Sequence, residues 1–331
     1  MIDTIGASAP MTQKLFKAVM AVSTKGYRRL FFRVKTQFGS FKIEVHVQSQ
    51  RLTWVFSPMK YLVGHNLFGT NNPHHLVLGI LGLIYDRFGL KFLQHDADFY
   101  AENGVLLSRA DVNGSFYVGS QVKVIETMAM LREHFLDHGH HIVEHEGPDG
   151  IETLNMGKNS SSSTVKFYNK YLELLGNPKL SKLPYYSDLL EYAEKSVRFE
   201  VTKRTPSLLK LGLESSTDWS VSTAHAILDE TLQDLGLSGQ LLAELPAVDL
   251  AGLNAASRAK YTLWQAGNDL KQHYPAHTFM RDRKNFLEMG IDIGRPHAYA
   301  NDAVTLSQRL SVERLRTTWP KRFEPLGAVL R

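Results

Sequence analysis

Two adjoining segments with the residue pattern of β-strands constrain the fold of this chain more than any other feature. Residues 29–34 (RLFFRV) and 41–47 (FKIEVHV) are rich in aromatic and β-branched residues, and the second alternates apolar with polar residues. Such alternation places one set of side chains on each face of a strand. Because residues 38–40 (FGS) supply a turn between them, the two segments predict an antiparallel hairpin.

The rest of the first 205 residues mixes strand patterns with helical ones. Further strands are predicted at residues 52–56, 105–116, 152–156, 164–167 and 197–202. Apolar residues at helical spacing predict helices at residues 75–88, 121–138 and 189–194. Many strands with few interleaved helices predict an α+β domain built on an antiparallel sheet.

From Pro206 onward the strand patterns fade. Helices are predicted instead at residues 223–237, 257–273 and 278–289. We therefore expect two domains, an α+β domain over residues 1–210 and a mainly helical domain over residues 211–331.

Positive charge gathers in the C-terminal quarter. The whole chain has 38 Lys+Arg against 33 Asp+Glu, a net charge of +5. Residues 258–331 hold 13 Lys/Arg and 7 Asp/Glu, a net of +6, so the remaining residues sum to about −1 (25 against 26). Local basicity is typical of a surface that binds a polyanion such as nucleic acid, although a solvated basic face has the same composition.

Several function classes are excluded or disfavoured. With no cysteine, the chain has no disulfide, zinc–thiolate site, iron–sulfur cluster or thiol nucleophile. No apolar run approaches the ~20 residues that cross a bilayer, and no secretory signal is visible, so we expect a soluble, intracellular protein. No GxGxxG, GxxxxGK[ST] or GxSxG motif is present.

Charged residues inside two predicted strands are candidates for chemistry. Arg109, Asp111 and Asn113 share one face of their strand because the side-chain period is two. Arg198 and Glu200 form the same pattern in another strand. If both strands belong to one sheet, Asp111 and Glu200 could converge on Mg²⁺ or Mn²⁺, which prefer oxygen ligands. Ordinary Arg–carboxylate pairs would give the same pattern.

Other candidates are a tyrosine and several histidines. Tyr168 stands two residues before Lys170, and a nearby cation favours the phenolate form of a nucleophilic tyrosine. Tyrosine is also common in strands without any such role. His46 and His65 are placed to face a site on the sheet, whereas five histidines between residues 134 and 145 suit either a metal pair or a solvated helix end.

Six short motifs in a fixed order carry a resemblance to a known family. They are residues 57–60 (SPMK), 64–70 (GHNLFGT), 108–111 (SRAD), 167–174 (FYNKYLEL), 190–193 (LEYA) and 197–200 (VRFE). This set resembles the replication initiators of filamentous phages, the gene II/X family. More distantly it is similar to the rolling-circle initiators of small plasmids and to the HUH endonucleases.

The resemblance implies a metal-dependent, site-specific DNA nickase with an HUH-like domain over residues 1–210. It implies that Tyr168 attacks a phosphodiester and becomes joined to the 5′ phosphate, leaving a 3′-OH that primes rolling-circle synthesis. Reversal of that step would join the displaced strand into a circle. Lys170 would lower the Tyr168 pKa or contact the scissile phosphate, and Tyr171 is a possible second tyrosine.

The metal and DNA contacts also follow from the resemblance. Asp111 and Glu200 would hold Mg²⁺ or Mn²⁺, and Arg109 and Arg198 would contact DNA. HUH enzymes carry two histidines around one apolar residue, whereas His46-Val47-Gln48 has one. Either carboxylates replace that pair, or His65 and His46 act as further ligands.

The C-terminal region predicts a helix–turn–helix that reads duplex DNA. Residues 261–270 and 279–290 would form its helices, with Thr278 as N-cap and Gly290 as C-cap. Arg281, Arg283 and Lys284 would project from the second helix into the major groove. An ordinary helical hairpin would have the same pattern.

The expected partners are origin DNA, a host helicase and a host polymerase in the bacterial cytoplasm, because no motor motif exists here to unwind a duplex. Two other functions fit the same features. One is a non-catalytic DNA-binding repressor or replication accessory protein. The other is a transposase or relaxase of the same chemistry.

Overall fold

The computed structural model describes most of the chain. The described residues are 1–23, 27–178, 180–183, 185–237, 255–265, 268, 270–288, 293–294 and 315–316. The predicted C-cap at Gly290 lies outside them. Among them, no helix is both long and apolar enough to span a bilayer.

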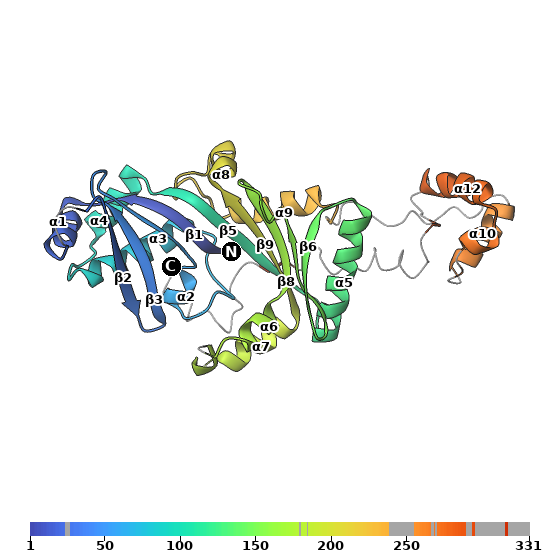
Figure 1. Ribbon diagram of the computed structural model, residues 1–331, viewed down its shortest axis with the longest axis horizontal. Helices are drawn as coiled ribbons and strands as arrows, with labels where there is room; N and C mark the ends of the chain where they lie inside the picture. Colours follow the sequence, from blue (N-terminus) through green and yellow to red (C-terminus); the bar gives the residue numbers. More distant parts are fainter. Residues whose placement is uncertain are drawn as a thin grey trace.

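One ten-stranded sheet organises the described chain, and all of its neighbouring strands are antiparallel (Figure 1). The strand order is β2-β3-β4-β1-β5-β9-β8-β7-β6, and a short β10 pairs with β5. This confirms the predicted α+β class with an antiparallel sheet. The strands are β1 (Ile2–Pro10), β2 (Arg29–Thr36), β3 (Gly39–His46), β4 (Arg51–Phe56), β5 (Leu106–Tyr117), β6 (Ile142–Gly147), β7 (Gly150–Met156), β8 (Ser163–Asn169), β9 (Ser196–Arg204) and β10 (Leu315–Arg316).

The helices cover the sheet's apolar face and its ends. Helix α3 contacts β1 and β2, α5 contacts β6 to β9, and α8 and α9 contact β5 and β9. The helices are α1 (Gln13–Ala21), α2 (Met59–Leu62), α3 (Pro73–Arg87), α4 (Gln94–Asn103), α5 (Gln121–Asp137), α6 (Lys170–Leu175), α7 (Tyr186–Glu194), α8 (Thr205–Leu211), α9 (Thr223–Asp234), α10 (Ala255–Gln265), α11 (Leu270–His273) and α12 (Ala276–Glu288).

The predicted hairpin is β2–β3, and its strands alternate between the two faces. Leu30 and Val34 on β2, and Phe41, Ile43 and Val45 on β3, are buried. Their neighbours in sequence point to the opposite, polar face. The same alternation along β4, β5, β8 and β9 gives the sheet one apolar and one polar face.

The sequence patterns missed β1, which is a central strand. Its residues (IDTIGASAP) include small side chains and no long apolar run, so its strand character is weak. Two ladders decide its state, because β1 pairs with β4 on one side and β5 on the other. Ile2 and Ile5 are fully buried there.

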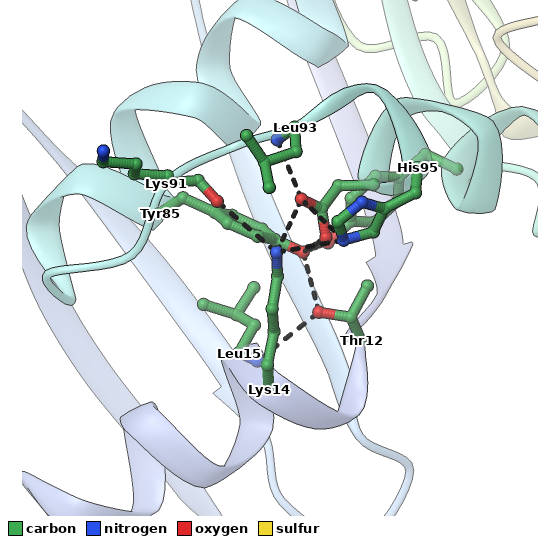
Figure 2. A network of polar contacts seen from close by, with 9 residues as sticks. Thr12, Lys14, Leu15, Tyr85, Lys91, Leu93 and His95 are labelled. Carbon is green, nitrogen blue, oxygen red and sulfur yellow. Dashed lines mark hydrogen bonds and ion pairs between the residues drawn. The ribbon is translucent and has the colours of Figure 1, made fainter.

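The N-terminal helices are locked to one another by a buried polar network (Figure 2). Asp96 of α4 receives the ammonium of Lys14 of α1 at 2.7 Å and the backbone N–H of Leu93 at 2.9 Å. Tyr85 of α3 lies 2.7 Å from the Thr12 hydroxyl and donates to Asp96 at 3.3 Å. Each polar group is thus satisfied within the network, which stabilises this end of the fold.

Two predictions for the C-terminal region meet the structure differently. Helix α12 begins at Ala276, with the Phe279 N–H donating to the Pro275 carbonyl, so Thr278 lies inside the helix and the predicted N-cap is wrong. The division at residue 210 stays a prediction. The core of the sheet nevertheless continues through Ile227 and Leu228 of α9 to Leu237.

Candidate active site

The strand register brings polar side chains from three strands together on the open face of the sheet. In the β5–β9 ladder Asn113 lies opposite Glu200. In the β8–β9 ladder Lys166 lies opposite Glu200, and Tyr168 opposite Arg198. Paired residues of antiparallel strands project to the same face, so these five side chains form one cluster.

Tyr168, at the end of β8, is buried and keeps its proton. Its hydroxyl donates to Glu200 Oε2 at 3.4 Å, and the Lys166 ammonium lies 4.2 Å from its ring centroid. Burial, and secondarily the negative charge of Glu200, raises the pKa of Tyr168 well above its ordinary value. A nucleophilic Tyr168 would therefore need a base to accept its proton.

Lys170 opens α6 and is not the residue that activates Tyr168. Its ammonium is buried, donates to Asn66 Oδ1 at 2.9 Å and pairs with Glu173 at 2.8 Å. Burial lowers the pKa of Lys170. The prediction that Lys170 depresses the Tyr168 pKa is wrong, because burial dominates and that pKa rises.

Asp111 and Arg109 form a bidentate pair on β5. Arg109 Nε donates to Asp111 Oδ1 at 2.7 Å, and Arg109 Nη2 to Oδ2 at 2.6 Å. This is the Arg–carboxylate pair that the alternation of β5 allowed as one alternative. The Asp111 side chain is 3% exposed and that of Arg109 is 35% exposed, so the guanidinium still reaches solvent.

Glu200 is the carboxylate most perturbed by its surroundings. Its pKa rises to about 7, because burial disfavours the ionised form and the charges of Asp111 and Asp3 add to that effect. Asp3, on the missed strand β1, accepts hydrogen bonds from the Ser57 hydroxyl and from Asn66 Nδ2. Three carboxylates therefore influence one another at the centre of the polar face.

The oxygen-rich chemistry of this cluster fits a hard divalent cation. The amide of Asn113 is fully buried opposite Glu200 and has no hydrogen-bond partner among the described residues. A cation would satisfy its oxygen and relieve the repulsion between the carboxylates. No group of three His, Cys, Asp or Glu side chains poised to hold a metal occurs in the described part of the chain.

Arg198 holds the GHN loop (residues 64–66) against the sheet. It is 2% exposed, and its Nη atoms donate to the carbonyls of Leu67 and Asn66 at 2.9 Å each and to Ser115 Oγ at 3.1 Å. A side chain so enclosed cannot reach a phosphate in this conformation. We therefore reassign Arg198 from DNA contact to positioning of the loop.

The two histidines are not brought together. His46 lies at the end of β3 that pairs with Arg51, and Arg51 pairs with Pro10 at the far end of β1 from Asp3. Its ring contacts Glu44 and Thr53 instead. The prediction that His46 joins the carboxylates as a ligand is therefore wrong.

His65 is fully buried in the GHN loop. Its Nδ1 accepts the Leu67 N–H at 3.2 Å. Burial, together with the charges of Lys170 and Arg198, lowers the pKa of His65 to about 3, so its ring is neutral at physiological pH. This hydrogen bond shapes the loop whose Asn66 side chain joins Asp3 to Lys170.

The remaining predicted residues lie on helices. Tyr171 of α6 is half-buried against the small apolar cluster around Leu174 and Leu189. On α12, Phe279 and Phe286 face the local core. Arg281, Arg283 and Lys284 lie between those core positions, with Arg281 and Lys284 exposed and Arg283 half-buried.

A pH dependence of stability follows from Glu200. Its folded-state pKa of about 7 exceeds its ordinary value of 4.5, so its contribution is fully present below pH ~4.5 and is lost as pH rises through ~7. We expect Glu200→Gln to be more stable than the wild type at pH 8 by roughly 1–2 kcal/mol, with a smaller difference at pH 5. Urea unfolding in EDTA at both pH values measures this, and an equal difference at the two pH values would contradict it.

Comparison with known families agrees with the motifs that line this site. Residues 1–222 match the family model that describes the N-terminal part of the phage replication-associated protein of gene II, and this match covers every strand of the site. The chain belongs to this family of phage replication-associated proteins.

Relatives extend this assignment beyond the matched region. The corresponding replication-associated protein of Enterobacteria phage I2-2 is 27% identical over 278 residues, covering 77% of this chain and 76% of that protein. A solved structure, described as a rolling circle replication initiator protein from Geobacillus stearothermophilus, is 13% identical, with a TM-score of 0.35, over 70% of this chain and 83% of that one.

Within the site of this replication-associated protein, sequence reasoning gave no role to Asp3, Lys166 and Asn66. Asn66 stood inside a resemblance motif and Asp3 near the start of the chain, and neither carried a chemical signal of its own. Lys166 could have been found, because it lies two residues before Tyr168 in a strand and so shares its face.

Proposed function

We propose that this phage replication-associated protein nicks one DNA strand at a replication origin through a Tyr168–5′-phosphate intermediate and later rejoins the displaced strand. The observation that supports this most is the Tyr168–Glu200 contact on the polar face, assembled from strands far apart in sequence. A buried phenol beside a carboxylate of raised pKa is a nucleophile–base pair.

The proposed step balances without any external energy source. The Tyr168 oxygen forms a bond to phosphorus as the bond from phosphorus to the 3′ oxygen breaks. Glu200 accepts the phenolic proton, and the released 3′ oxygen takes up a proton from water to become the 3′-OH primer. Because one phosphoester replaces another, the reverse reaction rejoins a strand without ATP.

The other side chains of the cluster position the reactants. Lys166 lies over the Tyr168 ring, where its charge can meet a phosphate oxygen. Lys170 and Arg198 hold the GHN loop in place. The half-exposed guanidinium of Arg109 is the group we assign to DNA contact on this face.

Glu200, Asp111 and Asn113 are the residues we assign to a divalent cation. When bound, Mg²⁺ or Mn²⁺ would neutralise charge on the phosphate undergoing transfer. Tyr171 stays a candidate second tyrosine. For the helical region we propose duplex-origin recognition by Arg281, Arg283 and Lys284, with a host helicase and polymerase as partners in the bacterial cytoplasm.

Incubation of the protein with supercoiled DNA of its replicon and Mg²⁺ or Mn²⁺ tests the proposal. We expect open circles on native gels and protein covalently joined to DNA on denaturing gels. DNA binding without nicking would support the repressor alternative. Strand transfer into unrelated DNA would support the transposase or relaxase alternative.

The cation assignment predicts a binding defect that is separate from activity. We expect Asn113→Ala and Asp111→Asn each to weaken Mn²⁺ binding about 10-fold or more, since each removes an oxygen ligand or its charge. Titration calorimetry with MnCl₂ measures this in the absence of DNA. Asn103→Ala, on the exposed end of α4, serves as the control. Unchanged Mn²⁺ binding by both site variants would place the cation elsewhere.

A further inference from the structure

The polar face of the sheet continues beyond the active site onto β2, β3 and β4, where basic and apolar side chains are exposed together. We call this surface the β2–β4 platform. Its outward residues are Arg29, Phe31, Arg33 and Lys35 on β2, Ser40, Lys42, Glu44 and His46 on β3, and Arg51, Thr53 and Val55 on β4.

The register shows that this platform and the active site share one face. Val55 of β4 pairs with Gly6 of β1, and Gly6 pairs with Arg109 of β5. Arg109 lies two residues from Asp111 on the active-site face. A Cβ at Gly6 would lie 2.6 Å from Ser108 Oγ and 3.2 Å from Val55 Cγ2, so glycine keeps this junction low.

The charge of the platform is strongly positive. It carries five Lys/Arg residues (29, 33, 35, 42 and 51) and one acidic residue, Glu44. Glu44 pairs with Arg29 at 3.2 Å, which leaves a clear cationic excess. In the described chain, Lys35 and Lys42 have no ion-pair partner, as expected of cations available to a polyanion.

An aromatic ring stands in the middle of these cations. Phe31 is 68% exposed, and Val55, also on the platform, is 60% exposed. Arg29 and Arg33 flank Phe31 on the same face of β2. An exposed ring among cations is the combination on which unpaired bases stack while the backbone meets positive charge.

We propose that the β2–β4 platform binds single-stranded DNA of the strand that leads to Tyr168. Neighbouring strands lie about 4.8 Å apart, so the five steps from β2 to β9 place the platform roughly 24 Å from Glu200. A strand crossing the sheet would therefore contact the platform and the active site at once. The route to Tyr168 rests on the proposed nicking function, whereas the binding itself does not.

Fluorescence anisotropy with a labelled oligonucleotide of about 16 nucleotides, in EDTA, tests the binding. We expect the double variant Phe31→Ala/Lys42→Ser to bind at least about 10-fold more weakly than the wild type, because it loses one stacking ring and one cation. Its dependence of log affinity on log salt should be shallower by about 0.7. Phe31→Trp should retain binding, because it keeps a ring on which bases stack.

Leu209→Ala/Lys210→Ser is the matched control, because it removes an exposed apolar residue and a lysine from α8, outside the platform. It should bind as the wild type does. Equal affinity of the platform variant and this control would overturn the proposal. Self-association of the wild type that Phe31→Ala abolishes, with unchanged DNA affinity, would assign the platform to a second copy instead.

Nicking of the same oligonucleotide with Mn²⁺ separates the two proposals. Weak binding by the platform variant, with no nicking even by the wild type, supports the platform while overturning the proposed nickase. Nicking by the wild type, with unaltered binding by the platform variant, overturns the platform alone.

Discussion

Tyr168→Phe is expected to abolish covalent attachment to DNA and to reduce nicking by about 10³-fold or more, because it deletes the proposed attacking oxygen. The ring, its burial and its contact with Lys166 are kept. Only the 3.4 Å hydrogen bond to Glu200 is lost, which should cost less than about 1 kcal/mol of stability. Denaturing gels with end-labelled DNA measure the adduct, and native gels measure nicked circles.

Tyr171→Phe is the matched control for that experiment. It makes the same change three residues later, on α6, where Tyr171 packs against an apolar cluster. We expect nicking and adduct formation to be retained. Loss of both in Tyr171→Phe, with both intact in Tyr168→Phe, would assign the nucleophile to Tyr171.

Arg198→Met is expected to destabilise the fold by about 3 kcal/mol or more. The substitution leaves the carbonyls of Asn66 and Leu67 without the donors that satisfy them. It also removes a buried positive charge that offsets Glu200. Urea unfolding followed by circular dichroism measures the free energy of unfolding.

Arg204→Met provides the control on the same strand. Arg204 is half-buried and donates a hydrogen bond of 3.2 Å to the Ser160 carbonyl. We expect its replacement to cost less than about 1 kcal/mol. Similar losses for the two arginines would show that Arg198 has no special part in holding the GHN loop.

Much of the sheet could be predicted because its strands announce themselves by local pattern. The alternation in β2 and β3, and the charged residues at every second position of β5 and β9, follow directly from the pleat of a strand. The placement of Asp111 and Asn113 on one face was correct for that reason. β1 escaped prediction because pairing on both sides, rather than its own residues, makes it a strand.

The pKa values at the site could not be predicted from sequence. Lys170 is near Tyr168 along the chain, and proximity alone suggested a lowered phenol pKa. In the fold, burial outweighs that charge and raises the pKa. The same holds for Arg198, whose pattern suggested a DNA contact and whose burial against Asn66 and Leu67 gives it a structural part.

The sequence by itself determined the antiparallel α+β class, the lack of thiol chemistry and the ordered motifs of the phage replication-associated family, because each depends on residue identity or short-range periodicity. Only the tertiary structure decided that Glu200 meets Tyr168, that His46 stands apart, and that five Lys/Arg residues share a face in a region of nearly balanced charge. Strand order and register set these outcomes, and both arise from contacts between residues distant in the chain.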